Sequence, residues 1–210
     1  MTMTKRTVLA ATALAFAGLG GFALAQGAAA PSVGQPAPAF SAKDADGRTV
    51  SLADYKGRTV VLEWTNDECP FVKKHYGGQA MQGLQKKWTA KDVVWLTVIS
   101  SPPGEQGFAD GPKAKRLSAD RGATPTAVVL DPKGDVGRAF KAQVTPHMYI
   151  VKGDGTLAYM GGIDDKPSTK LEDLKSAKNY VDAALTEISE GKPVSVPTSR
   201  PYGCTVKFSS

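Results

Sequence analysis

The chain has 210 residues, with 26 lysines and arginines against 20 aspartates and glutamates, and its formal net charge is +6. Because the basic residues are scattered and form no run interleaved with aromatic residues, the charge pattern argues against nucleic-acid binding. The length is sufficient for one domain with a substantial hydrophobic core.

The N-terminus has the pattern of a secretory signal. Lys5 and Arg6 precede an uncharged apolar stretch that ends in Ala23-Leu24-Ala25, which fits the small-x-small cleavage pattern. We therefore expect a signal peptide over residues 1–25, cleavage after Ala25, and a periplasmic or secreted protein. The alternative is an uncleaved anchor, but the stretch is short for spanning a bilayer. We expect no stable membrane association after cleavage.

The first part of the remaining chain predicts a hairpin and several buried strands. Residues 26–34 contain alanine, glycine and proline, and we expect them to form a flexible lead. A turn signal at Asp44-Ala45-Asp46-Gly47 separates two extended segments, which predicts an N-terminal β-hairpin. Three apolar runs farther along the chain are typical of buried strands. They cover residues 59–64, 93–99 and 126–130.

Helical patterns lie between and after these strands. In residues 70–87, apolar side chains recur at every fourth position, whereas Gly77, Gly78 and Gly83 weaken the helix and predict a break or kink. The final helix has the clearest apolar stripe and a glycine cap. The final helix covers residues 171–188, and two short helical segments cover residues 113–119 and 136–141.

A second hairpin precedes the final helix, with strands at residues 148–152 and 156–160 around Gly153-Asp154-Gly155. The earlier alternation of strands and helices predicts a right-handed parallel βαβ core, and the late hairpin predicts an antiparallel edge. The predicted fold class is α/β: three layers, a mixed central sheet with helices on both faces, and an N-terminal β-hairpin extension.

Cys69 lies between the first buried strand and the helix that follows it. The N–H groups of a first helical turn and the helix dipole favour a thiolate, and such a position can lower a cysteine pKa from about 8.5 to between roughly 3.5 and 7.5. Asp67 and Glu68 would raise this pKa, and Lys73 and Lys74 would offset them. Redox or nucleophilic chemistry at Cys69 is the leading hypothesis.

The second of the two cysteines is Cys204, in a tail over residues 191–210 that carries three prolines. A Cys69–Cys204 bridge would close a loop of about 135 residues and contribute roughly 5 kcal/mol to stability in the chain-entropy model. Exported proteins with an even cysteine count usually pair them. The sequence leaves open whether Cys204 resolves an oxidised Cys69 or forms a permanent structural disulfide.

These features together resemble the thioredoxin fold, in its redoxin or peroxiredoxin-like (AhpC/TSA-type) branch. A cysteine stands at a strand-to-helix junction, Thr145-Pro146 precedes a hairpin strand, and a helix follows the hairpin. By this resemblance, we expect the redoxin domain to cover residues 35–190. Segments that resemble this branch, or a secreted peroxiredoxin-like subgroup of it, cover residues 33–40, 52–57, 64–76, 159–165 and 201–207.

The resemblance implies an exported thiol-dependent oxidoreductase, most directly a peroxiredoxin-like thiol peroxidase with Cys69 as nucleophile and Cys204 as a possible resolving cysteine. It implies a cis Pro146 beside Cys69. Such peroxidases place threonine or serine three residues before the cysteine; here that residue is Asn66, and Thr65 one position earlier is the catalytic candidate. The implied partners are a peroxide or disulfide-containing substrate and an external thiol reductant such as a thioredoxin-like protein, without cofactor or metal.

The sequence also departs from the family patterns, so two alternatives stay open. Val72 stands where a dithiol oxidoreductase has its second cysteine, so Cys69 forms no local disulfide. Arg121 and Arg138 are candidates for the arginine that peroxidases use to polarise peroxide. The alternatives are a thiol-disulfide oxidoreductase or reductase, and a non-catalytic binding module with a structural Cys69–Cys204 disulfide.

Both histidines have simple structural interpretations. We expect His75 on the helix surface, and His147 follows Pro146. A copper site formed by Cys69 and both histidines is the metal-binding alternative, as in copper chaperones that share this fold. We expect Asp164 and Asp165 to form a turn. Core positions are expected for Trp64, Trp88 and Trp95.

Overall fold

The computed structural model describes residue 2 and residues 30–208. The predicted signal peptide, apart from residue 2, and residues 26–29 of the predicted lead lie outside the described residues. Residues 32–35 form a turn in which the Gln35 N–H group donates to the Ser32 carbonyl oxygen, and Pro36 pairs with Thr156 at the sheet edge. None of the described helices is long and apolar enough to cross a bilayer.

Among the described residues, seven strands form the central sheet, in the order β2-β1-β5-β4-β3-β7-β8. β3, β4 and β5 run parallel, whereas β7, β8 and β1 are antiparallel to their neighbours. The hairpin β1–β2 extends the sheet by pairing β1 with β5. The strands are β1 Ser41–Asp44, β2 Thr49–Ser51, β3 Val60–Trp64, β4 Val94–Ile99, β5 Ala127–Leu130, β7 His147–Val151 and β8 Leu157–Gly161.

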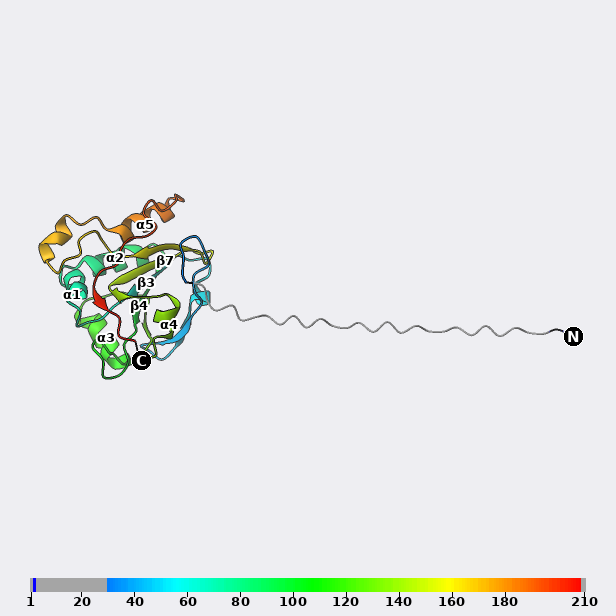
Figure 1. Ribbon diagram of the computed structural model, residues 1–210, viewed down its shortest axis with the longest axis horizontal. Coiled ribbons are helices and arrows are strands. Elements are labelled where there is room, and N and C mark those ends of the chain that lie inside the picture. The colour runs from blue at the N-terminus through cyan, green and yellow to red at the C-terminus, as the bar shows by residue number, and fades with distance from the viewer. Residues whose placement is uncertain (1, 3–29, 209–210) are drawn as a thin grey trace.

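Helices cover both faces of this sheet (Figure 1). Alternate strand residues point to opposite sides, so that Val61 packs in one core with side chains of α1, α2 and α5, and Leu62 packs in the other with α4. The helices are α1 Pro70–Gly77, α2 Ala80–Thr89, α3 Gly111–Asp120, α4 Asp135–Ala139 and α5 Tyr180–Ser189, with short 3-10 helices η1 Leu52–Tyr55 and η2 Leu171–Lys175.

The predicted α/β class is confirmed, with its mixed sheet, covering helices and N-terminal hairpin. The predicted break in the long helix occurs between α1 and α2, where Gly78 is followed by Gln79 at a φ of 62°. The predicted start of the final helix at residue 171 is wrong. The helix α5 begins at Tyr180, because the side chain of Asn179 caps it by accepting a hydrogen bond from the Asp182 N–H group. Leu171, the first residue of the predicted helix, is 53% exposed.

The tail after α5 folds back across the domain. Its residues 197–208, hereafter the C-terminal strap, begin beside β8, where the Met160 N–H group donates to the Pro197 carbonyl oxygen. They continue into β9 Cys204–Thr205, which pairs with β6 Val144–Thr145 in a separate small sheet. The strap ends with Phe208 packed near α4. It therefore carries Cys204 into the middle of the fold.

Candidate active site

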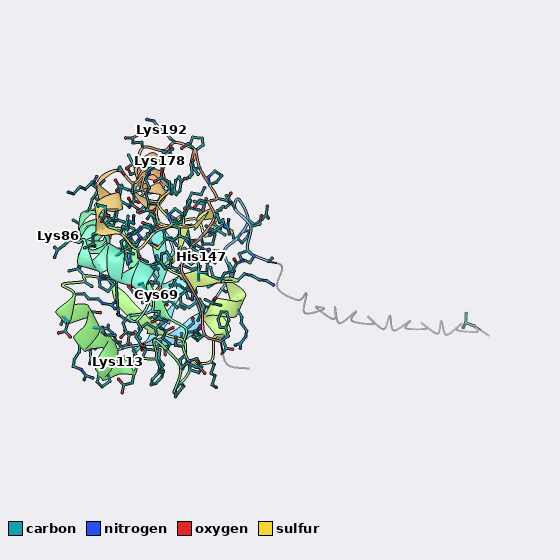
Figure 2. The ribbon with its side chains drawn as sticks, turned by 60° about the vertical axis from the view of Figure 1, so that its left-hand side comes forward. Cys69, Lys86, Lys113, His147, Lys178 and Lys192 are labelled. Carbon is teal, nitrogen blue, oxygen red and sulfur yellow. The ribbon has the colours of Figure 1, made fainter. Side chains whose placement is uncertain are left out.

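Cys69 is the N-cap residue of α1, directly after the turn that leaves β3. That turn is held by Asn66, whose side-chain oxygen accepts a hydrogen bond from the Glu68 N–H group at 2.9 Å. A Cβ atom at Gly107 would lie 2.4 Å from the Asn66 side chain, so the facing loop requires glycine there. The Cys69 side chain is fully buried, and Figure 2 shows its place inside the molecule.

The loop that faces Cys69 contains a cis peptide bond between Thr145 and Pro146. The predicted cis geometry is therefore confirmed. The Cys69 thiol donates a hydrogen bond to the Thr145 carbonyl oxygen, with 3.1 Å between the two atoms. The cis-proline loop thus forms one wall around the Cys69 sulfur.

The strap forms a second wall. In the β6–β9 pair, Cys204 lies opposite Thr145, the residue whose carbonyl oxygen accepts the hydrogen bond from the Cys69 thiol. Gly203 allows this close approach, because a Cβ atom there would lie 1.9 Å from the Thr145 carbonyl oxygen. Both cysteines are free thiols in this structure. Cys204 is half-buried, whereas Cys69 has no exposed surface.

The two thiols differ in their readiness to ionise. Burial raises the pKa of Cys69, but hydrogen bonds from the Cys204 thiol and from the Val72 N–H group outweigh it and leave the pKa below the ordinary value. Burial raises the pKa of Cys204 to about 12, and its interaction with Cys69 acts in the same direction. The arrangement therefore favours ionisation of Cys69 over ionisation of Cys204.

Replacing Cys204 by alanine is expected to raise the pKa of Cys69, because the largest favourable hydrogen bond to its sulfur is lost. Iodoacetamide alkylation of the reduced protein, followed at Cys69 by peptide mass spectrometry from pH 5 to 10, would show a midpoint at higher pH and a several-fold slower reaction at pH 6. Cys204→Ser retains a hydroxyl donor and serves as the matched control. Identical alkylation profiles for the alanine variant and the wild type would contradict the assignment.

The charged neighbours do not act as the sequence suggested. The Glu68 carboxylate accepts a hydrogen bond from a backbone N–H group at 3.1 Å, and Asp67 lies 3.6 Å from the Lys113 ammonium group. The prediction that Lys74 offsets the effect of these acids on the pKa of Cys69 is wrong. The Lys74 ammonium group is buried and donates to a backbone carbonyl at 2.8 Å. Hydrogen bonds, rather than these charges, lower the pKa of Cys69.

Thr65 and the two candidate arginines lie in other surroundings. The Thr65 hydroxyl has no hydrogen-bond partner among the described residues. Thr65 lines a small cavity with Tyr76 and Arg121, and Cys69 is not among the lining residues. Arg121 stacks on the Tyr76 ring at 4.6 Å, and Arg138 stacks on an aromatic ring near the chain end at 5.1 Å. The structure thus brings Cys69, Cys204 and the cis-proline together, whereas Thr65 lines a separate cavity.

The surface placement predicted for His75 is wrong. Its side chain is buried, and burial together with the charge of Lys74 lowers its pKa to about 3. His147 is also buried, and its Nδ1 atom lies 3.2 Å from the Tyr149 hydroxyl. Within the part of the chain that the structure describes, no three histidine, cysteine or acidic side chains are grouped so that they could hold a metal ion. The copper alternative therefore has no geometric support there.

Sequence reasoning missed Glu63, a fully buried acid on β3. Its carboxyl group accepts hydrogen bonds from the Tyr76 hydroxyl at 2.7 Å and the Trp95 indole at 2.8 Å, and Gln85 donates a third at 3.1 Å. Burial raises the pKa of Glu63 despite these donors. The available signal was an acidic residue inside an otherwise apolar strand. The network joins β3 to α1, α2 and β4, and so fixes the strand that leads to Cys69.

A thiol held in this way at the start of a helix, on a sheet of this topology, places the protein among the redoxins, which are thiol-dependent oxidoreductases. More particularly, the chain belongs to the AhpC/TSA family, whose model matches residues 33–160. The resemblance noted from the sequence, and the enzyme class it implied, are confirmed.

Individual relatives agree with this assignment. A Mycobacterium tuberculosis H37Rv protein with a provisional peroxiredoxin name is 30% identical over 146 residues, covering 58% of this chain and 92% of that protein. An uncharacterized conserved protein from Geobacillus kaustophilus has a TM-score of 0.72 at 25% identity, covering 85% of this chain and 93% of that chain. A structure from Chlorobium tepidum, provisionally titled a thiol:disulfide interchange protein, has a TM-score of 0.54 at 23% identity, covering 74% and 99%. This last likeness confirms the thioredoxin-like fold.

Proposed function

We propose that the protein is an exported, peroxiredoxin-like thiol peroxidase in which Cys69 is the peroxide-reactive nucleophile and Cys204 is the resolving cysteine. One observation carries this proposal: β9 places Cys204 opposite Thr145, the residue whose carbonyl oxygen accepts the hydrogen bond from the Cys69 thiol. The lowered pKa of Cys69 and the raised pKa of Cys204 suit these two roles. Complete burial of Cys69 favours a small oxidant over a folded protein disulfide.

The reaction has two steps inside the protein. The Cys69 thiolate attacks one peroxide oxygen; the S–O bond forms, the O–O bond breaks, and the departing oxygen takes a proton and leaves as an alcohol or water. The Cys204 sulfur then attacks the sulfenic acid at Cys69. The disulfide forms as the hydroxyl group leaves with the Cys204 proton as water. An external thiol, such as a thioredoxin-like protein, would return the disulfide to the dithiol.

Export fits this chemistry. The signal pattern in residues 1–25 predicts delivery to a periplasmic or extracellular space, where disulfides persist. In this proposal, residues 35–190 form the redoxin domain. The tail of residues 191–210 supplies the second cysteine rather than acting as a linker.

The products of one turnover test the proposal. Reduced protein treated with one equivalent of hydrogen peroxide is expected to lose two hydrogens and to yield a cross-linked peptide that joins Cys69 to Cys204. In Cys204→Ser, dimedone is expected to trap a sulfenic acid at Cys69. Unchanged thiols in the wild type, or oxidation that bypasses Cys69, would contradict the proposed peroxidase.

Thiol-disulfide exchange is the second candidate. The β6–β9 pairing favours it, because the pairing shows that the edge beside Cys69 can bind an extended segment that carries a cysteine. The edge of β6 accepts an extended strand with a cysteine opposite Thr145. A substrate peptide with a disulfide can pair with this edge only after β9 has left it. Cys69-dependent reduction of insulin by dithiothreitol, without peroxide consumption, would support this candidate.

A further inference from the structure

A buried polar cluster lies beside the two thiols and has no part in the proposed chemistry. Tyr202 of the strap donates a hydrogen bond from its hydroxyl group to the Asp164 carboxylate. The Nε2 atom of His75 lies 3.2 Å from the same hydroxyl oxygen. Lys74 completes the cluster, with its ammonium group 3.9 Å from Asp164 and 5.3 Å from the centre of the Tyr202 ring. These groups join the strap, α1 and the segment after β8.

The protons in this cluster can be placed. Since the Tyr202 hydroxyl donates to Asp164, the hydrogen on His75 must be on Nε2, which then donates to the Tyr202 oxygen. With a pKa lowered to about 3, His75 is neutral at physiological pH. The negative charge of Asp164 therefore faces Lys74 and the Tyr202 hydroxyl. Burial makes each of these hydrogen bonds costly to lose.

The position of Tyr202 connects this cluster to the thiols. Tyr202 stands two residues before Cys204, and its ring packs edge-on against Phe71, two residues after Cys69, at 5.8 Å between ring centres. Through His75 it also contacts the helix that Cys69 caps. In Figure 1 the strap, drawn in red, passes beside α1 before it runs toward α4. Tyr202 thus ties the strand that carries one cysteine to the helix that carries the other.

We propose that Tyr202 is a positioning residue, a latch that holds the C-terminal strap closed so that Cys204 stays against Cys69. This inference rests on the proposed function, in which Cys204 must reach the oxidised sulfur. While the latch is closed, the strap shields Cys69 and the disulfide forms rapidly. Release of the latch exposes Cys69 to larger molecules and slows the resolution step; it slows the first attack on a small peroxide less, through loss of the Cys204 interaction that lowers the pKa of Cys69.

Tyr202→Phe tests the latch, because it removes the hydroxyl group and keeps the ring over Lys74. A hydrogen bond to a charged group commonly contributes enough that its loss slows disulfide formation about tenfold or more. Tyr180→Phe is the matched control, since Tyr180 and Tyr202 line the same cavity of about 630 Å³. Rapid-quench mass spectrometry after one equivalent of peroxide would give the resolution rate. Alkylation of Cys69 by a bulky maleimide should become faster in Tyr202→Phe and stay unchanged in Tyr180→Phe.

A second pair of variants separates the latch from simple destabilisation. Asp164→Asn retains an oxygen that accepts the Tyr202 hydrogen bond and should resolve within about threefold of wild type, whereas Asp164→Leu should behave like Tyr202→Phe. Sulfenic acid formation, measured in the Cys204→Ser background, should slow by a smaller factor than disulfide formation does in every case. Equal resolution rates in Tyr202→Phe and wild type, with normal sulfenic acid formation, would overturn the latch alone. Absence of sulfenic acid would instead overturn the proposed function.

Discussion

Replacing Cys69 by serine is expected to lower peroxide consumption to the rate of reductant alone. A serine hydroxyl is not ionised near neutral pH and cannot pass through a sulfenic acid, so neither half of the cycle can proceed. Removal of a catalytic nucleophile commonly costs on the order of a thousandfold or more in rate. Peroxide loss with dithiothreitol as reductant, compared in wild type and Cys69→Ser, measures this effect. The variant preserves the size of a buried side chain, so its far-UV circular dichroism should match the wild type.

Cys204→Ser provides the complementary control. It keeps the nucleophile, so the first equivalent of peroxide should be consumed at close to the wild-type rate. With excess peroxide, the unresolved sulfenic acid at Cys69 is expected to advance to sulfinic acid, which the wild type avoids by forming its disulfide. Equal turnover in wild type and Cys69→Ser would rule out this nucleophile. Full protection from overoxidation in Cys204→Ser would show that another thiol resolves Cys69.

The sequence predicted the central architecture well because the relevant signals are local. β3 and β4 are apolar over nearly their whole length, as buried parallel strands are. Gly77, Gly78 and Gly83 together predicted a break or kink, and the structure places the break at Gly78 and Gln79. The final helix was misjudged, because its apolar stripe continues by chance to Leu171. The capping side chain of Asn179 begins the helix nine residues later.

The site was only partly predictable, because half of it comes from a distant segment. The position of Cys69 between a strand and a helix predicted a reactive thiol, and the family resemblance predicted the cis peptide bond at Pro146. No local pattern shows that the strap covers α1, and so His75 was assigned to the surface although it is buried. Asp164 was assigned to a turn, and its contact with Tyr202 depends on the same long-range packing. The pairing of Cys204 with Thr145 required the folded structure.

Gly203→Ala is expected to move the two thiols apart without changing either cysteine. A Cβ atom at Gly203 would lie 1.9 Å from the Thr145 carbonyl oxygen, and the glycine has a φ of +146°, a region that other residues rarely adopt. The strand β9 must therefore move away from β6, and Cys204 moves with it. A displacement of about 1 Å between reacting groups can cost on the order of a hundredfold in rate. We expect disulfide formation after one equivalent of peroxide to slow by about that factor.

Gly191→Ala is the matched control for this prediction. Gly191 also has a positive φ, of +69°, but a Cβ atom there meets no atom within 4 Å. The control therefore carries a backbone cost of about 1 kcal/mol in stability, without a collision near the thiols. It should form the disulfide at the wild-type rate, whereas Gly203→Ala should accumulate the sulfenic acid that dimedone traps. Rapid disulfide formation in Gly203→Ala would mean that Cys204 reaches Cys69 without the β6–β9 contact, and that strand pairing is not what brings the sulfurs together.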